Sequence, residues 1–196
     1  MRPSLDFFFF HGSTYTYLTV LRIEEAARAA GVDVRWRPFS VRAIMAEMNN
    51  TPFAGKPAKL NYMWRDLERR AAKLGLPFKG APGYPADKDL LANHVGTVAA
   101  EEGWCPAYAR ASYRGWFLED RMLGERDSVI HAVKESGHDP ERVLARAQDV
   151  LTKARWEAET DAARKLGIFG SPTFAVGTEI FWGDDRLEDA IDWAGR

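Results

Sequence analysis

Gly167-Ile168-Phe169-Gly170-Ser171-Pro172-Thr173-Phe174 is the stretch that decides the fold. Its first glycine closes a long helical pattern, and its proline stands directly before a strand-like run over residues 173–176. A second strand-like run, residues 180–182, follows after three residues that fit a hairpin connection. The chain then ends in an amphipathic helical pattern, so residues 167–196 predict a strand, a strand and a helix.

The amino-terminal end has a complementary pattern. Residues 5–10 contain four consecutive phenylalanines, which cannot alternate between core and water and therefore predict a strand covered on both faces. The helical spacing that starts at Thr14 stops at Gly31, and residues 32–36 alternate as a second strand that ends at Pro38. A strand, a helix and a strand in close succession predict a parallel pair with a right-handed crossover.

The middle of the chain is helical by pattern. Apolar spacing predicts helices over residues 60–74, 90–103 and 108–116, and Asp139-Pro140 is a good start for one long helix that ends near Leu166. Strand, helix and strand at one end, with strand, strand and helix at the other, is the plan of a thioredoxin-like domain. We therefore predict an α/β fold in which residues 1–55 and 161–196 form that domain, and residues 56–160 form an all-helical insertion.

The composition narrows the function classes. The 196 residues carry a net charge of −1, so there is no broad basic field for nucleic acid or anionic membrane. No apolar run approaches the roughly 20 residues that span a bilayer, and the first run is too aromatic for a signal peptide, so a cytoplasmic protein is expected. The single Cys105 excludes a Cys-x-x-Cys pair, and we expect it to be a buried bystander. The histidines lack metal-ligand spacing, so no metal is expected.

The segment Ser13-Thr14-Tyr15-Thr16 stands where a redox thioredoxin-like domain would carry Cys-x-x-Cys. Any thiol chemistry must therefore use the sulfur atom of a bound ligand. Ser13 lies just before the first predicted helix, where it could donate a hydrogen bond to a bound thiolate and lower its pKa. An ordinary helix N-cap is the alternative, and position alone favours it.

Four further positions near the carboxyl terminus are candidates. Pro172 sits where a thioredoxin-like plan has a cis-proline, which would leave the backbone of Ser171 free to pair with an extended, peptide-like ligand; an ordinary trans proline is the alternative. Asp185 could accept a ligand ammonium group, and Asp184 could help to hold the ligand by donating its backbone N–H. Asp185-x-x-Glu188 also fits a helix capping box, and capping is the safer interpretation from the sequence.

Two polar residues in the middle region have weaker signals. Asn50 falls in the turn-prone run 49–52, where asparagine is common for conformational reasons. Lys59 opens a predicted helix, where its charge opposes the helix dipole and hints at an anionic partner, although most such lysines are solvated. His11 has no carboxylate partner in the local sequence, so packing or solvent exposure is expected for it.

Together these stretches resemble the 2-hydroxychromene-2-carboxylate isomerases, glutathione-dependent enzymes allied to kappa-class glutathione transferases and DsbA-like oxidoreductases. The resemblance spans the chain through residues 7–18, 36–39, 50–62, and 167–174 with 182–187. It implies the following site: a catalytic Ser13 at the glutathione sulfur, Asn50 and Lys59 around glutathione and the substrate, Ser171 before Pro172 on the tripeptide backbone, and Asp184 with Asp185 at the γ-glutamyl end.

The resemblance also implies an activity. In the family reaction the glutathione thiolate adds to the chromene ring, the ring opens, a bond rotates, and elimination gives trans-o-hydroxybenzylidenepyruvate and free glutathione. The implied partners are a small aromatic substrate and glutathione, in aromatic catabolism, and a homodimer is implied because family members are commonly dimers. The alternatives are a kappa-like transferase that acts on another electrophile and a non-catalytic thioredoxin-fold binding protein.

Overall fold

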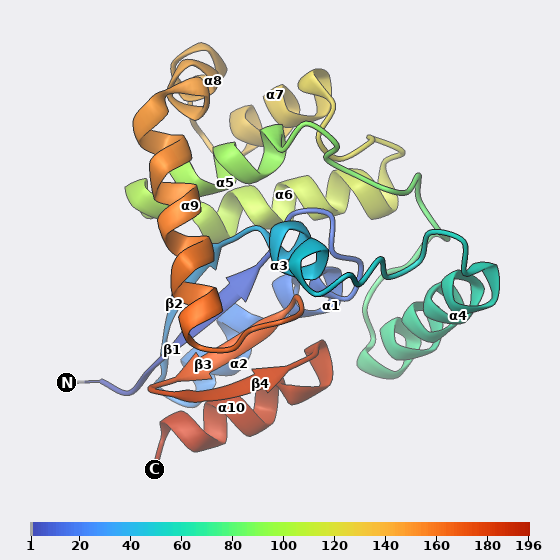
Figure 1. Ribbon diagram of the computed structural model, residues 1–196, viewed down its shortest axis with the longest axis vertical. Coiled ribbons are helices and arrows are strands. Elements are labelled where there is room, and N and C mark those ends of the chain that lie inside the picture. The colour runs from blue at the N-terminus through green and yellow to red at the C-terminus, as the bar shows by residue number, and fades with distance from the viewer. Residues whose placement is uncertain (1) are drawn as a thin grey trace.

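The computed structural model describes residues 2–196 and contains one four-stranded sheet with helices on both sides (Figure 1). The strands are β1 (Ser4–Phe9), β2 (Asp33–Pro38), β3 (Thr173–Val176) and β4 (Glu179–Trp182), in the order β2-β1-β3-β4. Strand β1 pairs parallel with β2 and antiparallel with β3, which pairs antiparallel with β4. The predicted parallel pair and the predicted hairpin are both confirmed.

The helices that flank the sheet are short. Helices α1 (Thr16–Val20) and α2 (Ile23–Ala29) connect β1 to β2, and the turn η1 (Asp184–Arg186) leads from β4 into α10 (Leu187–Ala194). The single helix predicted to end at Gly31 is therefore wrong, because the chain leaves helical geometry at Arg22, where φ is −132°.

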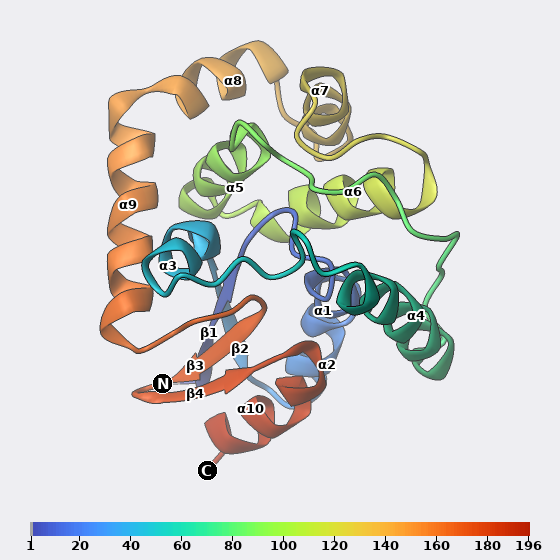
Figure 2. The same ribbon diagram turned by 45° about the vertical axis from the view of Figure 1, so that its right-hand side comes forward.

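The remaining helices form most of the rest of the molecule. They are α3 (Val41–Glu47), α4 (Pro57–Leu74), α5 (Leu91–Glu102), α6 (Cys105–Leu118), α7 (Arg126–Glu135), α8 (Pro140–Gln148) and α9 (Val150–Lys165). Helices α5 to α8 gather at one end of the molecule, α9 runs back from them to the sheet, and α4 stands to one side between two irregular segments (Figures 1 and 2).

The long helix predicted from Asp139 to Leu166 is two helices. Asp139 caps α8 as predicted, since its carboxylate accepts hydrogen bonds from the backbone of Glu141 and Arg142. Asp149 then adopts an extended conformation and accepts a hydrogen bond from the backbone N–H of Leu151, so it caps a second helix. The chain turns a corner there (Figure 2). Helices α3 and α7 were not predicted.

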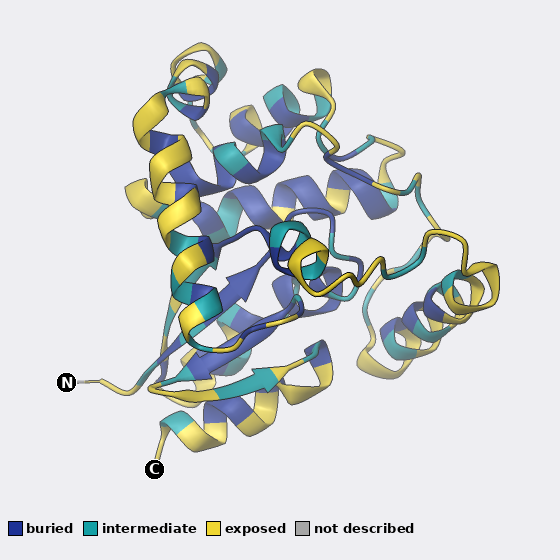
Figure 3. Cartoon of the chain, viewed as in Figure 1, coloured by how far each residue is buried: buried dark blue, intermediate teal, exposed yellow. Residues whose placement is uncertain are grey.

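The aromatic strand β1 lies between two hydrophobic clusters. Leu5, Phe7 and Phe9 belong to the larger cluster, with side chains of α1, α2, α5 and α6, whereas Phe8 and Phe10 belong to a smaller one with Phe39 and Trp156 of α9. The strand is buried along this run (Figure 3). The prediction of a strand covered on both faces is confirmed, and the carboxyl end of β1 is held between both clusters.

The larger hydrophobic cluster contains side chains of the sheet, such as Phe7, and of helix α6, such as Tyr108. Helix α4 joins the same cluster through Met63, Leu67 and Ala71. The boundaries predicted at residues 55/56 and 160/161 stay a prediction.

Candidate functional site

The turn that follows β1 carries Ser13. The backbone N–H of Ser13 donates to the carbonyl of Phe10 at 3.0 Å, which closes the turn. Gly12 has a φ of 109°, and a Cβ there would come within 3.1 Å of the Phe10 ring and 3.3 Å of the Ala86 carbonyl. A glycine is therefore required, and the turn leaves Ser13 partly exposed at the carboxyl end of β1.

Ser13 and Ser171 meet at this turn. The Ser13 hydroxyl donates to the backbone carbonyl of Ser171 at 2.7 Å. The Ser171–Pro172 peptide bond is cis, the state that the thioredoxin-like plan anticipated. The Ser171 hydroxyl accepts from the backbone N–H of Phe10 at 2.9 Å and lies 3.1 Å from the hydroxyl of Thr16. The structure thus brings together two predicted residues that lie far apart in the sequence.

The N-cap interpretation of Ser13 is wrong. Tyr15 is the residue at the N-cap of α1, and no side chain caps that helix. The Ser13 hydroxyl is a donor to Ser171 rather than an acceptor for helix N–H groups.

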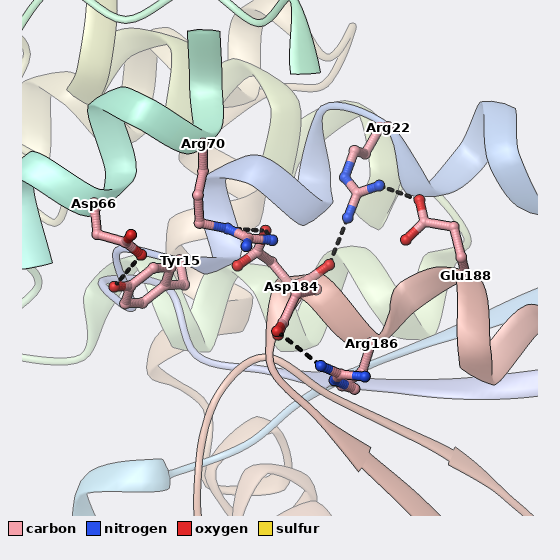
Figure 4. Close-up of polar contacts among 8 residues, drawn as sticks. Tyr15, Arg22, Asp66, Arg70, Asp184, Arg186 and Glu188 are labelled. Carbon is pink, nitrogen blue, oxygen red and sulfur yellow. Dashed lines mark hydrogen bonds and ion pairs between the residues drawn. The ribbon is translucent and has the colours of Figure 1, made fainter. Parts of the chain in front are cut away.

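The acidic pair at the end of β4 divides into one buried and one exposed carboxylate. Asp184 is 2% exposed and accepts two hydrogen bonds from Arg70 of α4, at 3.1 and 2.7 Å, while Arg22 donates to its backbone carbonyl (Figure 4). Burial raises the pKa of Asp184, and the Arg70 guanidinium opposes that rise. Asp185 is exposed and pairs with Arg186 at 3.2 Å. The capping-box interpretation is wrong, because α10 begins after Arg186 without a side-chain cap.

Helix α4 contributes three polar contacts to this region. Besides the Arg70 pair, the Tyr15 hydroxyl donates to Asp66 at 2.9 Å, and the Thr14 hydroxyl donates to the Met63 sulfur at 3.0 Å. Figure 4 shows the Tyr15–Asp66 pair and the Arg70–Asp184 pair. Residues 63, 66 and 70 share one face of α4, so their spacing in the sequence was the signal available for this surface.

A cavity of about 220 Å³ lies beside these pairs. Its lining contains cationic and anionic side chains together with one apolar residue, Leu74; the charged residues are Arg22, Arg70, Lys73, Asp185 and Glu188. Groups of both signs around a small opening suit a ligand that carries both a carboxylate and an ammonium group. Sequence patterns did not single out Arg22, Arg70 or Lys73.

Asn50 and Lys59 lie outside this cluster. Asn50 is exposed, and its backbone N–H donates to Met45 at 2.8 Å. The Lys59 ammonium lies 5.6 Å from the centre of the Phe53 ring. Within residues 2–196, no hydrogen bond joins the side chain of either residue to Ser13, Ser171 or Asp184, and their roles toward a ligand stay predictions.

Cys105 and His11 are both fully packed. The Cys105 thiol donates to the Gly96 carbonyl at 3.6 Å, and burial raises its pKa, so the expectation that Cys105 is buried is confirmed. His11 is fully buried rather than exposed, and burial lowers its pKa to about 3. Over the described range 2–196, no three His, Cys, Asp or Glu side chains are grouped to hold a metal ion, and none of the helices combines the length and apolarity needed to span a bilayer.

Fold and site together define a thioredoxin-like protein in which Ser13 follows the first strand and lies against Ser171, the residue before a cis-proline. The DsbA-like thioredoxin domain family matches residues 4–192, and the chain belongs to that family. A 2-hydroxychromene-2-carboxylate isomerase from Sphingobium xenophagum is 26% identical over 96% of this chain and 96% of its own length. Glutathione S-transferase kappa 1 from Caenorhabditis elegans is 26% identical over 97% of this chain and 90% of its own.

A solved structure supports the fold. The structure titled 2-hydroxychromene-2-carboxylate isomerase superimposes with a TM-score of 0.82, at 24% identity, over 98% of this chain and 95% of that chain. The predicted thioredoxin-like α/β fold and the predicted family relationship are confirmed.

Proposed function

We propose that this protein is a glutathione-dependent isomerase that interconverts 2-hydroxychromene-2-carboxylate and trans-o-hydroxybenzylidenepyruvate. Isomerases of this name and kappa-class transferases are similar to it over nearly their whole length, which supports an enzyme of this group. The observation that carries the proposal is the contact between Ser13 and the carbonyl of Ser171, the two groups that the family resemblance assigns to the sulfur and the peptide backbone of glutathione.

The protein itself offers no accessible sulfur nucleophile. Its one cysteine is buried, and its thiol pKa is raised, so it stays a thiol at neutral pH. A bound glutathione would supply the thiolate that adds to the substrate and later leaves it. Such a diffusible nucleophile suits a reaction in which the sulfur must be released at the end.

The residues around the turn fit that cofactor. Ser13 would donate its hydroxyl hydrogen to the sulfur and stabilise the thiolate, which lowers the thiol pKa. The Ser171 backbone would pair with the peptide backbone of the tripeptide. The mixed-charge cavity next to Asp185 would hold the zwitterionic γ-glutamyl end, with Asp185 accepting the ammonium group. Asn50 and Lys59 would approach the substrate from the segment around the start of α4.

A kappa-class-like glutathione transferase is the second candidate, and the transferase from Caenorhabditis elegans favours it. The two functions differ in the fate of the adduct, which the isomerase breaks down and the transferase releases as a conjugate. Localisation in the cytoplasm and homodimerisation remain predictions, and light scattering after gel filtration checks the latter.

The test follows the ultraviolet absorbance of 2-hydroxychromene-2-carboxylate mixed with the protein, with and without glutathione. We expect glutathione-dependent equilibration with the open-chain product and a loss of roughly 10²-fold or more in kcat for Ser13→Ala, the size of effect seen when a key charge-stabilising donor is removed. Ser136→Ala is the matched control, since Ser136 donates to Ala132 within α7 and lies outside the site. Activity without glutathione, or full activity of Ser13→Ala, would overturn the proposal.

Mass spectrometry of the mixture separates the two enzyme candidates. A stable glutathione conjugate without isomerised product supports the transferase. Calorimetric binding of glutathione with neither product supports the third interpretation, a non-catalytic binding protein.

A further inference from the structure

The turn that carries Ser13 is held from outside by two buried side chains of the helical region. Tyr113 of α6 is fully buried, and its hydroxyl donates to the carbonyls of Phe10 at 3.0 Å and of Ser13 at 3.1 Å. One hydrogen is thus shared between the residue that begins the turn and the residue that ends it. The Tyr113 hydroxyl therefore fixes how far apart the carbonyls of Phe10 and Ser13 lie.

Asn93 of α5 holds the backbone of His11, which lies between Phe10 and Ser13 in the turn. Its amide oxygen accepts from the backbone N–H of His11 at 2.9 Å, and its amide nitrogen donates to the His11 carbonyl at 2.9 Å. Asp87 fixes the orientation of that amide, because its carboxylate accepts from the Asn93 side chain and also from the backbone N–H groups of Ala92 and Asn93. Side chains from two helices thus bind the backbone of Phe10, His11 and Ser13 in the turn.

Ser13 precedes α1 and makes no side-chain contact that caps that helix. Its hydroxyl reaches across to Ser171. Its carbonyl is held by Tyr113 alone among the side chains of the described residues. The direction of the Ser13 Cα–Cβ bond therefore depends on two contacts. One is the turn bond from the Ser13 N–H to the Phe10 carbonyl, and the other is the Tyr113 hydroxyl, which binds both ends of that turn.

The Tyr113 hydroxyl is a permanent donor. Burial raises its pKa well above the usual range, so the phenol stays protonated across the pH range of the protein. Its ring stacks with His11 at 5.9 Å and packs against Phe117, which fixes the ring plane. Tyr113→Phe would keep this packing and remove only the donor.

We infer that Tyr113 is a positioning residue that sets Ser13 for its contact with the glutathione sulfur. This inference rests on the proposed function. A hydroxyl that is displaced by a fraction of an ångström would still leave room for glutathione but would stabilise the thiolate less. Loss of the Tyr113 hydroxyl should therefore reduce thiolate formation and turnover and leave the affinity for glutathione nearly unchanged.

The experiment compares Tyr113→Phe with Tyr108→Phe. Tyr108 is an equally buried tyrosine of the same helix, and its ring also packs against His11. Its hydroxyl donates to the Ala92 carbonyl at 3.2 Å and binds neither end of the turn. Each variant loses one buried hydroxyl donor, which binds two carbonyls in the case of Tyr113 and one in the case of Tyr108, so both are expected to lower the melting temperature. The decisive readouts are the pKa of bound glutathione, followed by thiolate absorbance against pH, and the separate values of kcat and KM.

For Tyr113→Phe we expect the pKa of the bound thiol to rise by roughly one unit, and kcat at a pH below that pKa to fall about tenfold. The KM for glutathione should stay within about twofold of the wild-type value. Tyr108→Phe should leave the thiol pKa unchanged. Equal thiol pKa values in the two variants, or a loss confined to KM, would overturn the positioning role.

A second measurement does not depend on glutathione. In a Ser13→Cys background, the rate of alkylation by iodoacetamide against pH reports the environment of position 13, because Cys105 is buried. Adding Tyr113→Phe should shift this pH profile, and adding Tyr108→Phe should not. If the wild-type protein fails to bind glutathione, the proposed function fails, and this profile still decides whether Tyr113 positions residue 13; an unshifted profile rejects that role.

Discussion

The Ser13 hydroxyl donates to the Ser171 carbonyl at 2.7 Å, so in this arrangement the two groups that would contact glutathione satisfy each other. Ser13 has a single hydroxyl hydrogen, which cannot point at the carbonyl and at a sulfur at the same time. A ligand with its own N–H for the carbonyl would release that hydrogen. A ligand without one would compete with the carbonyl for it.

The first prediction concerns thiol selectivity. 2-Mercaptoethanol has no peptide N–H, and we expect it to support isomerisation at least about tenfold more slowly than glutathione at matched thiolate concentration, a difference the size of one hydrogen bond to a charged group. Initial rates over a concentration series of each thiol give the comparison. Equal rates would mean that the carbonyl of Ser171 plays no part in selectivity.

The second prediction separates the two neighbouring aspartates. Asp184→Asn removes the charge from a buried carboxylate that accepts two hydrogen bonds from Arg70, so the free energy of unfolding should fall by about 1–3 kcal/mol. Asp185→Asn changes only an exposed pair and should cost less than about 0.5 kcal/mol.

Urea unfolding and glutathione titration together test this division. Asp185→Asn should weaken glutathione binding and leave the free energy of unfolding nearly unchanged. Asp184→Asn should lower the free energy of unfolding more than it weakens glutathione binding. Indistinguishable stabilities of the two variants would contradict the assignment.

The third prediction concerns acid. Burial lowers the pKa of His11 from 6.5 to about 3, so the unfolded chain binds a proton that the folded chain rejects between these values. The stability contributed by the neutral imidazole is complete above pH 6.5 and is lost on acidification, with a slope of at most about 1.4 kcal/mol per pH unit.

His11→Phe removes this titration. Both ring nitrogens of His11 lack a hydrogen-bond partner in residues 2–196, so the substitution costs no hydrogen bond. The difference in unfolding free energy between wild type and variant, measured from neutral pH down to about pH 5, isolates the effect from that of the carboxylates. The variant should lose less stability on acidification, and parallel curves would contradict the prediction.

The fourth prediction uses two helical glycines. A Cβ at Gly96 would lie 2.7 Å from Cε1 and 2.9 Å from Nδ1 of His11, and that ring is enclosed by Phe9, Tyr108 and Tyr113. Gly96→Ala should therefore destabilise the protein by about 1–3 kcal/mol despite the better helix propensity of alanine.

Gly115→Ala is the matched control in α6. Its Cβ would meet the Arg121 side chain at 3.6 Å, an ordinary contact, so we expect a gain of about 0.5–1 kcal/mol from helix propensity. Thermal unfolding of both variants measures the contrast. Equal effects would show that the close approach of α5 to His11 does not limit residue 96.

The strands of the sheet and the closeness of Ser13 to Ser171 could be predicted from the sequence. Four successive phenylalanines admit only a doubly covered strand, and the ends of neighbouring strands must meet, which places Ser13 near Ser171. The break at Asp149 was missed because aspartate is compatible with the exposed face of a helix, and its capping role depends on a change of chain direction. Local spacing carries no information about that direction.

The polar contacts of α4 and α6 could not be predicted for a related reason. Periodicity identifies the buried face of a helix, but the partner of each side chain depends on how that helix is oriented against the sheet. Arg70 and Asp184 lie 114 positions apart, and Tyr113 and Ser13 lie 100 apart. Only the assembled fold brings each pair within bonding distance.

The aromatic run of β1 has a last consequence, for strand alignment. Sliding residues 7–10 by one position replaces phenylalanine with phenylalanine almost everywhere, so the hydrophobic pattern penalises a misaligned strand very little. Its two ends must supply the distinction. Asp6 binds Arg35 and Arg37 of β2 at one end, and Asn93 binds the His11 backbone at the other. A chain without either anchor would have a degenerate strand register, and the error would be carried directly into the position of Ser13.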